Sequence, residues 1–311
     1  MNIIIPTALQ PGDTVGITCP AGFVSYERIA YAVETLQRWG FQVRVGKTVG
    51  ERTTYFSGSD EERRDDLQEM LDDTSVKAII AGRGGYGTSR IIDELDFSGF
   101  QKNPKWICGF SDITVLHSHI NKNYNIATLH SPMCRAFDAD RENSYYVQSL
   151  RKALTGEDLH YHFASSDHNK TGTATGELTG GNLAMLAHIT GSISQADTKG
   201  KILFIEDIGE HLYHIDRLLL NLKRSGQLEN LAGMLIGTFT ETEDTDRPFG
   251  QTLEQIILSK VAGYHFPVAF NVPCGHDTEN ITLQMGRMHT MTVNDAGSSL
   301  SCLPVSQEMP V

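Results

Sequence analysis

The sequence predicts an α/β protein of two domains, the first built on a parallel sheet and the second of mixed character. The chain has 311 residues and a mass of 34.4 kDa, more than a single hydrophobic core usually supports. Short runs rich in β-branched residues alternate with amphipathic segments over residues 13–128. Near the end of the chain, three strand-like runs are separated only by turns. These three observations set the fold class.

The first domain, residues 1–135, is predicted to consist of alternating strands and helices. Such alternation means parallel strands with helices on both faces, as in flavodoxin-like folds, and places functional sites at the carboxyl ends of the strands. The expected pairs are strand 14–18 with helix 26–39, strand 41–45 with helix 60–71, strand 78–81 with helix 88–95, and strand 106–110 with helix 112–121, followed by strand 126–129.

The second domain, residues 173–311, is predicted to mix helices and strands. Residues 136–172 are polar and rich in His, Asp and Ser, with one helical pattern at 146–154, and we interpret them as a crossover linker. The elements expected after it are helix 181–189, strand 201–205, helix 214–222, strand 234–238 and helix 253–261, and then strands 268–272, 281–285 and 289–293.

Composition narrows the possible partners and compartment. The formal charge of −12 and the absence of a basic block argue against a nucleic acid or an anionic membrane as partner. The five cysteines are far apart and form no CxxC pair, so neither a disulfide framework nor a zinc knuckle is indicated. No signal peptide is evident at the start, and no segment approaches the length of a membrane span. A soluble protein of the cytoplasm is therefore expected.

Ser111 is the first candidate for chemistry. It follows the predicted strand 106–110 and precedes a helical pattern carried by Ile113, Leu116 and Ile120. A serine on such a strand-to-helix turn stands clear of the sheet, and the first N–H groups of the helix have no intrahelical partners. Ser111 is therefore a candidate nucleophile. The alternative is that its hydroxyl only caps the helix.

A serine nucleophile requires a base and an acid that orients the base. His276 lies in a polar turn between two predicted strands, and His130, at the end of another strand, is its rival. Glu206 and Asp207 end a strand of buried appearance, and either could orient a histidine. Acidic residues at this place also stabilise the start of the following helix. Sequence reasoning leaves both choices open.

A glycine-rich turn suggests a competing class of enzyme. Gly82, Gly84 and Gly87 match the pattern G-x-G-x-x-G, directly after a strand and before a helix, as a dinucleotide-binding site requires. However, the turn follows the third predicted strand and not the first. The same backbone could equally offer N–H groups to an oxyanion beside Ser111.

Two histidines three residues apart raise the possibility of a metal site. His211 and His214 could share one face of a helix, and acidic residues lie nearby. No HExxH motif is present, and the start of an amphipathic helix explains the same pattern. Metal catalysis is therefore not favoured. The acidic neighbours are Glu206, Asp207, Glu210 and Asp216.

Taken together, these motifs resemble those of the LD-carboxypeptidase family of serine peptidases, which includes the microcin C immunity peptidases. Several motifs in one order along nearly the whole chain are more specific than any one of them. The matching pieces are LQPGD at 9–13, PAG at 20–22, GRGGYG at 82–87, GFSDIT at 109–114, GGNL at 180–183, IED at 205–207 and GH at 275–276.

The resemblance implies a catalytic triad of Ser111, Glu206 and His276, with an oxyanion hole formed by the backbone N–H groups of Gly85 and Asp112. The implied reaction hydrolyses an amide between an L-centre, typically diaminopimelate, and a C-terminal D-amino acid. It would release D-alanine from murein tetrapeptides during peptidoglycan recycling. The resemblance implies no metal or cofactor, and it implies a homodimer.

The sequence gives weaker signals for the residues that contact the substrate and for the branch of the family to which the chain is most similar. Arg83 could pair with the terminal carboxylate of the substrate or be a solvated turn residue, and Asn182 could contact the substrate or cap a helix. The immunity branch is expected to stack a nucleotide on a tryptophan in the second domain, but Trp39 and Trp106 both lie in the first. A microcin C-type immunity peptidase, a nucleotide-dependent enzyme using Gly82–Gly87 and a non-catalytic murein peptide binder remain as alternatives.

Overall fold

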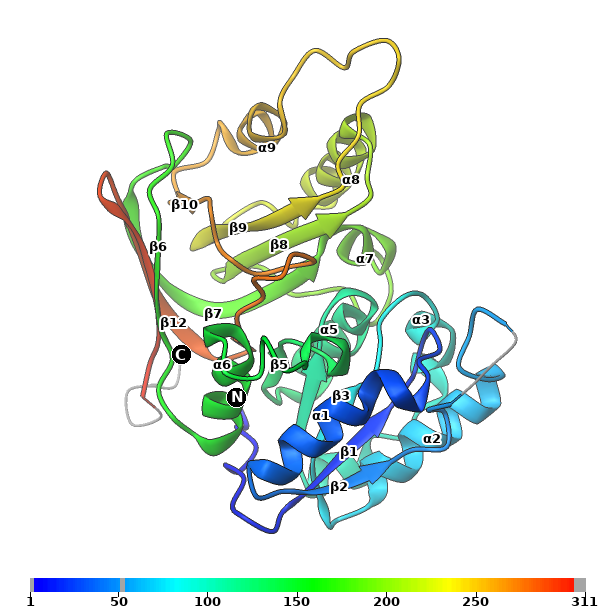
Figure 1. Ribbon diagram of the computed structural model, residues 1–311. Coiled ribbons are helices and arrows are strands. Elements are labelled where there is room, and N and C mark those ends of the chain that lie inside the picture. The colour runs from blue at the N-terminus through cyan, green and yellow to red at the C-terminus, as the bar shows by residue number, and fades with distance from the viewer. Residues whose placement is uncertain (1–2, 51–53, 305–311) are drawn as a thin grey trace.

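The computed structural model describes residues 3–50 and 54–304 and contains two sheets, one of six and one of seven strands. The six-stranded sheet lies in the lower lobe of Figure 1 and the seven-stranded sheet in the upper lobe. The α/β class with a largely parallel first sheet, predicted from the sequence, is confirmed. None of the helices within the described ranges combines the length and apolarity needed to cross a lipid bilayer.

The first sheet has the strand order β11-β5-β4-β3-β1-β2. Its five strands from the first half of the chain run parallel, whereas β11 runs antiparallel to β5. The strands are β1 (Thr14–Thr18), β2 (Gln42–Val45), β3 (Val76–Ala81), β4 (Trp106–Gly109), β5 (Thr128–His130) and β11 (Leu283–Met285).

Helices cover both faces of the first sheet because consecutive residues of a strand point to opposite sides. Ile80 of β3 packs in one cluster with residues of α1, and its neighbour Ile79 packs in another with residues of α2 and α5. Ser59 begins α2 with a capping box that includes Glu62. The helices are α1 (Tyr26–Arg38), α2 (Asp60–Asp72), α3 (Thr88–Ile91), α4 (Ser98–Lys102) and α5 (Thr114–Tyr124).

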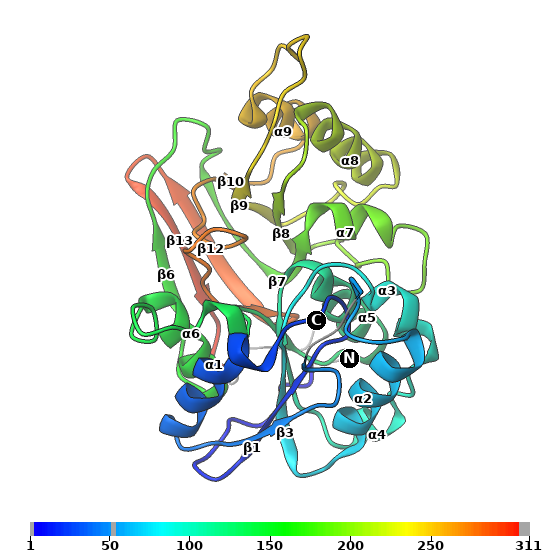
Figure 2. The same cartoon turned by 45° about the vertical axis from the view of Figure 1, so that its right-hand side comes forward.

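The second sheet has the order β10-β9-β8-β7-β12-β13-β6 and is half parallel and half antiparallel. The long strand β7 joins the two halves, and Figure 2 shows the antiparallel half on the left, above α6 (Tyr145–Thr155). The strands are β6 (His160–Phe163), β7 (Gly172–Asn182), β8 (Ile202–Ile208), β9 (Gly233–Thr240), β10 (Val268–Ala269), β12 (Met288–Asn294) and β13 (Gly297–Cys302).

Three helices pack on the parallel half of the second sheet through a third apolar cluster. They are α7 (Leu183–His188), α8 (Leu212–Arg224) and α9 (Leu253–Val261). In each, the buried residues recur at helical spacing, as with Ile215, Leu219 and Leu222 of α8, so burial of one face stabilises the helix. The remaining helix, α6 (Tyr145–Thr155), packs instead on the cluster shared with α1.

The structure differs from the sequence expectations in several places. The helix expected at 146–154 is present as α6, but residues 136–172 also contain the edge strand β6, whose exposed His160 and His162 give it the composition of a polar linker. Residues 181–182 end β7 instead of starting a helix, and β13 was not expected. The strand expected at 281–285 joins the first sheet through β11, so the chain crosses back between the lobes.

Candidate active site

The backbone turns sharply at Ser111, as the sequence predicts. β4 ends at Gly109, Phe110 remains extended, and Ser111 adopts φ 65° before a 3₁₀ turn leads into α5. A positive φ in a residue with a side chain costs about 1–3 kcal/mol and persists only where the surrounding structure enforces it. Such strain at a strand-to-helix turn is typical of a nucleophile that must project from the sheet.

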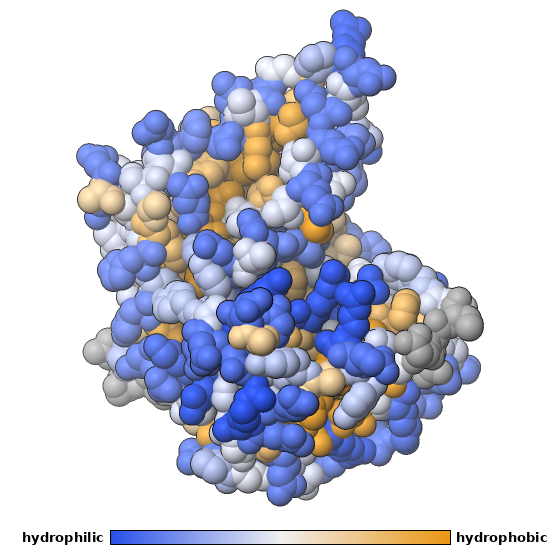
Figure 3. Space-filling view, in the orientation of Figure 1, coloured by the Kyte–Doolittle hydropathy of each residue, from blue (hydrophilic) through white to orange (hydrophobic). Residues whose placement is uncertain are grey.

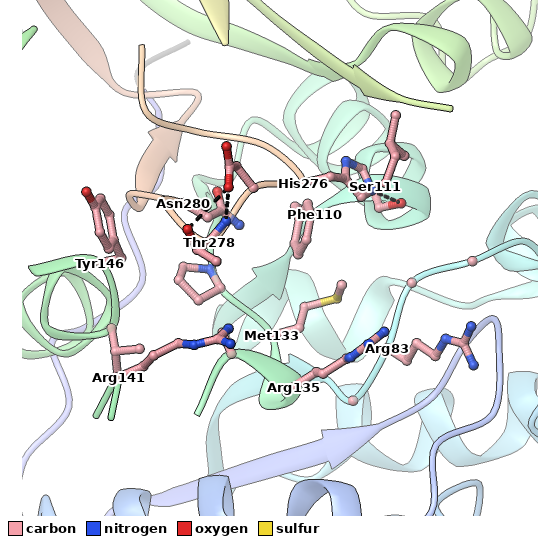
Figure 4. Close-up of a pocket in the computed structure, with 18 of the residues that line it drawn as sticks. Arg83, Phe110, Ser111, Met133, Arg135, Arg141, Tyr146, His276, Thr278 and Asn280 are labelled. Carbon is pink, nitrogen blue, oxygen red and sulfur yellow. Dashed lines mark hydrogen bonds between the residues drawn. The ribbon is translucent and has the colours of Figure 1, made fainter. Parts of the chain in front are cut away.

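The three residues of the expected triad lie in one hydrogen-bonded chain. Nε2 of His276 is 3.0 Å from Oγ of Ser111, and Nδ1 of His276 is 2.7 Å from Oε2 of Glu206. Figure 4 shows the imidazole directed at the serine. With the proton on Nδ1, the ring donates to the carboxylate and accepts from the serine hydroxyl. This geometry allows a base to remove the serine proton while an acid orients the base.

His276 is held on a loop and Glu206 on a strand. Glu206, in β8, is fully buried, while the His276 side chain is 14% exposed and its ring lies 4.8 Å from that of Phe110. The loop is shaped by Gly275, at φ 144°, whose N–H donates to Oδ1 of Asn280 at 3.2 Å. The base therefore depends on a loop conformation and on one buried carboxylate.

The glycine-rich turn lies against the nucleophile. A Cβ placed on Gly84 would be 3.0 Å from Cβ of Ser111, so a side chain at this position would crowd the nucleophile unless the turn shifted. The Gly84 carbonyl accepts from the N–H of Gly22 at 3.0 Å, and Gly85 follows at φ 109°. The turn thus presents backbone, and no side chain, beside the serine.

The Asp112 side chain ties the nucleophile turn to the glycine turn. Its Oδ2 accepts from the N–H of Thr88, the first residue of α3, at 2.8 Å. Burial raises the pKa of this carboxyl, and the bond from Thr88 opposes that rise. From the other side, the buried Arg63 guanidinium donates to the carbonyl of Gly87 at 3.0 Å and also to that of Pro20. The start of α3 is therefore already occupied by a carboxylate of the protein.

His130, the other candidate for the base, does not contact Ser111. His130 is completely buried between Phe110 and Phe204, and burial lowers its pKa well below the usual value. Among the described residues, neither of its ring nitrogens has a hydrogen-bond partner. The phenyl ring of Phe110 contacts both His130 and His276, but the hydrogen bond to Ser111 comes from His276.

Asp207 and Asn182 stabilise the start of α7. Oδ1 of Asp207 accepts from Nδ2 of Asn182 at 2.9 Å, and Oδ2 accepts from the N–H of Ala184 at 2.9 Å. Oδ1 of Asn182 accepts from the N–H of Met185 at 3.1 Å. Burial raises the pKa of Asp207 to about 6. Asn182 is buried, and these are the bonds of a helix cap, which is one of the two roles that the sequence left open for it.

One of the two histidines suspected of metal binding, His214, is engaged otherwise, whereas Nδ1 of His211 is buried without a hydrogen-bond partner among the described residues. His214 contacts Glu210 through Nδ1, and Asp216 contacts Nζ of Lys260. Within residues 3–50 and 54–304, no group of three or more His, Cys, Asp or Glu side chains is arranged to hold a metal ion.

A cavity of about 600 Å³ opens beside the triad and is lined by both lobes. Figure 3 shows strongly hydrophilic residues across the middle of this face, where the two lobes meet. Arg83 lines the cavity and donates to the carbonyl of Phe23 at 3.1 Å. The lining residues that sequence reasoning did not single out include Arg135, Arg141, Tyr146, Glu241, Thr278 and Asn280.

Most of these missed residues lie in segments interpreted as linker or turn. Arg135 and Arg141 flank the expected domain boundary, and their proximity to Arg83 depends on how β5 leads into α6. The available signal was two arginines close together in a chain of net charge −12, which needs local cations to bind an anion. No sequence motif marked Thr278.

Profiles of two domains match this chain in the order in which the two lobes occur. The LD-carboxypeptidase N-terminal domain matches residues 15–131, and the LD-carboxypeptidase C-terminal domain matches residues 175–291. The chain belongs to the LD-carboxypeptidase family. The first match ends one residue after β5, and the second begins within β7 and includes β11, the strand that the second half of the chain adds to the first sheet.

Individual members of the LD-carboxypeptidase family are similar over nearly the full length. A probable murein peptide carboxypeptidase of Bacillus subtilis is 36% identical over 92% of this chain and 91% of its own. The crystal structure of muramoyltetrapeptide carboxypeptidase from Oxalobacter formigenes superimposes with a TM-score of 0.85 at 30% identity, covering 94% of this chain and 99% of that one. The microcin C7 self-immunity protein of Escherichia coli is 25% identical over 91% of each chain.

Proposed function

We propose that this protein is a serine LD-carboxypeptidase that removes a C-terminal D-amino acid from murein peptides. The observation that carries the proposal is the hydrogen-bonded chain from Ser111 through His276 to Glu206, at one wall of the cavity. Family membership and the names of the relatives from Bacillus and Oxalobacter support a carboxypeptidase with a murein peptide substrate.

The proposed reaction is acyl transfer through a covalent intermediate. Ser111 attacks the carbonyl carbon of the scissile amide while Nε2 of His276 takes the hydroxyl proton. Glu206 keeps the other ring proton on Nδ1 and stabilises the imidazolium. His276 then gives its proton to the departing D-amino acid amine, and the C–N bond breaks. A water molecule activated by His276 hydrolyses the acyl ester and releases the shortened peptide.

The oxyanion of each tetrahedral intermediate would be bound by backbone N–H groups of Gly85 and Asp112. Gly85 lines the same cavity as Ser111, and Asp112 follows the nucleophile at the start of its helical turn. Each such donor is worth roughly 3 kcal/mol of transition-state stabilisation. The proposed mechanism uses protein groups only, so we expect EDTA to leave turnover unchanged.

A second candidate is hydrolysis of a peptide-nucleotide conjugate, because one relative is a microcin C7 self-immunity protein. Neither Trp39 nor Trp106 is among the described residues that line the cavity, which leaves no tryptophan there for stacking a base. A nucleotide-dependent enzyme is less well supported, because the start of α3 already binds the Asp112 carboxylate where a phosphate would bind.

The deciding experiment incubates the protein with a murein tetrapeptide ending in D-alanine and follows the products by mass spectrometry. We expect loss of one D-alanine, no cleavage of the all-L peptide, and labelling of Ser111 by a fluorophosphonate probe. Binding of the tetrapeptide without turnover would instead identify a murein peptide binder. Turnover of a peptide-nucleotide conjugate in place of the tetrapeptide would select the second candidate.

The family resemblance also leads us to propose that the protein works in the cytoplasm, in peptidoglycan recycling, as a homodimer. Size-exclusion chromatography with light scattering tests the oligomeric state, and a mass near that of the single chain would contradict the dimer. Fractionation of cells that produce the full chain tests the compartment.

A further inference from the structure

Three arginines follow one another along one wall of the cavity. Figure 4 shows Arg141, Arg135 and Arg83 in this order below the triad, and all three line the cavity. Arg83 belongs to the glycine turn, whereas Arg135 and Arg141 come from the segment between β5 and α6. Concentrating cations in one cavity of a chain with net charge −12 favours an anionic ligand there.

These guanidinium groups keep donors free for a ligand. Arg135 is exposed and takes part in no ion pair or hydrogen bond that the structure shows among the described residues. Arg141 contacts Asp138 through Nε at 3.2 Å, and both side chains are nearly half exposed. A guanidinium has five N–H donors, and carboxylate is the group that its planar fork binds best.

The cavity is larger than the leaving group requires. Its volume of about 600 Å³ is typical of a site for a molecule much larger than one amino acid. Besides Ser111, its lining includes Ser144 and Tyr146 at the start of α6 and Thr278 of the loop that carries His276. Arg141, Ser144 and Thr278 are among the residues that line this cavity, so we expect it to hold a polar part of the acyl group.

We propose that Arg135 and Arg141 form a second anionic subsite, which binds a carboxylate on the side chain of the residue that donates the scissile carbonyl. The proposal rests on the proposed LD-carboxypeptidase function. Arg83 is left for the terminal carboxylate, because it adjoins Gly84, whose backbone lies against Ser111. The two subsites together select a substrate with carboxylates on both sides of the scissile amide, as in a peptide whose third residue is diaminopimelate.

The test compares two tetrapeptides that differ only at the third residue. One carries diaminopimelate, and the other carries lysine, which keeps the side-chain ammonium and lacks the carboxylate. We expect the wild-type protein to cleave the diaminopimelate peptide with a kcat/KM about tenfold to a hundredfold higher, mainly through KM. Arg135→Gln and Arg141→Gln should each reduce this preference, because kcat/KM should fall further for the diaminopimelate peptide than for the lysine peptide.

A matched control is Arg151→Gln, which removes an exposed arginine of α6 that does not line the cavity. It should retain the full preference. Equal losses on both peptides in Arg135→Gln and Arg141→Gln would overturn the subsite. So would losses that disappear when the terminal carboxylate is amidated, because the two arginines would then bind that group.

Failure of this proposal and failure of the proposed function give different results. If wild-type protein cleaves both peptides equally well, the carboxypeptidase function stands and the second subsite is wrong. If neither peptide loses D-alanine and the fluorophosphonate does not label Ser111, the function itself is wrong, and the subsite fails with it.

Discussion

The nucleophile and its base are held in place by different means. Ser111 is fixed by main chain, through a strained φ, the end of β4 and the close approach of Gly84. His276 lies on a loop, and its direction depends on a hydrogen bond to the buried Glu206. The position of Ser111 is therefore set within the first lobe, whereas its hydrogen bond with His276 forms only when both lobes are docked.

The loop that carries His276 connects the two lobes. It leaves the second sheet after β10 and enters the first sheet as β11, which pairs with β5. A second tie lies nearby, where the N–H of Asn182 at the end of β7 donates to Oγ1 of Thr114 at 3.0 Å. The pairing of β11 with β5 and the bond from Asn182 to Thr114 thus hold the two lobes together, and with them the base and the nucleophile.

The largest expected effect is the removal of either end of the triad. Ser111→Ala and His276→Ala should each lower kcat by about 10⁴-fold to 10⁶-fold, and the double variant should lose little more, because the two residues act as a unit. Both should keep the wild-type Tm, since neither side chain fills the core. Steady-state kinetics and thermal unfolding measure this. Retained activity in His276→Ala together with loss in His130→Ala would show that the wrong base was chosen.

Replacing Glu206 tests how His276 is oriented without changing Ser111. Glu206→Gln keeps the shape of the side chain and can no longer enforce the proton on Nδ1 of His276, so we expect kcat to fall by about 10⁴-fold with KM little changed. Fluorophosphonate labelling of Ser111 should slow in parallel. A loss of less than about tenfold would mean that the loop alone orients the imidazole.

Two glycine substitutions, one beside Ser111 and one beside His276, compare how the two residues are held. Gly84→Ala places a methyl group 3.0 Å from Cβ of Ser111, and the resulting displacement should cost about 100-fold in kcat with the free energy of unfolding nearly unchanged. Gly275→Ala meets Thr238 and Glu206 at a φ of 144°, so it should lower kcat and also destabilise the fold by about 1–3 kcal/mol. Kinetics and urea unfolding separate the two. Similar losses of stability in both variants would show that Ser111 and His276 are not held in place by different means.

The smallest expected effect is on stability alone, at the other carboxylate of β8. Burial raises the pKa of Asp207 to about 6, above the value of about 3.9 expected in the unfolded chain. The unfolded state therefore ionises first as pH rises, and stability should fall by up to about 3 kcal/mol between about pH 4 and pH 7. Asp207→Asn should remove this slope and leave kcat within a few-fold of wild type.

The measurement is urea unfolding of the wild-type protein and the variant across that pH range. An identical pH dependence in both would show that the Asp207 carboxyl does not titrate in this window. A large loss of kcat in Asp207→Asn would show that α7 positions the triad more directly than its contacts suggest.

The sequence predicted those parts of the molecule that depend on neighbouring residues. Alternation of apolar and polar residues placed β1 at residues 14–18 and α9 at residues 253–261, as found. The turn at Ser111 was also predictable, because an apolar run stops where a helical pattern starts. The prediction failed where the polarity of a segment did not reveal its structure. In β6, the exposed His160 and His162 gave the strand the composition of a linker.

By itself, then, the sequence determined the α/β class, the strand ends at which polar residues gather, and the motifs that the family shares. Residue patterns left both His276 and His130 as possible bases and both Glu206 and Asp207 as possible acids, and the family resemblance implied His276 and Glu206. Only the tertiary structure shows the contacts themselves, from His276 to Ser111 and to Glu206. Consecutive residues of a strand face opposite sides, so one of these two carboxylates faces the base and the other caps α7. Which side faces the base is set by the pairing of strands far apart in the chain, and no local pattern records it.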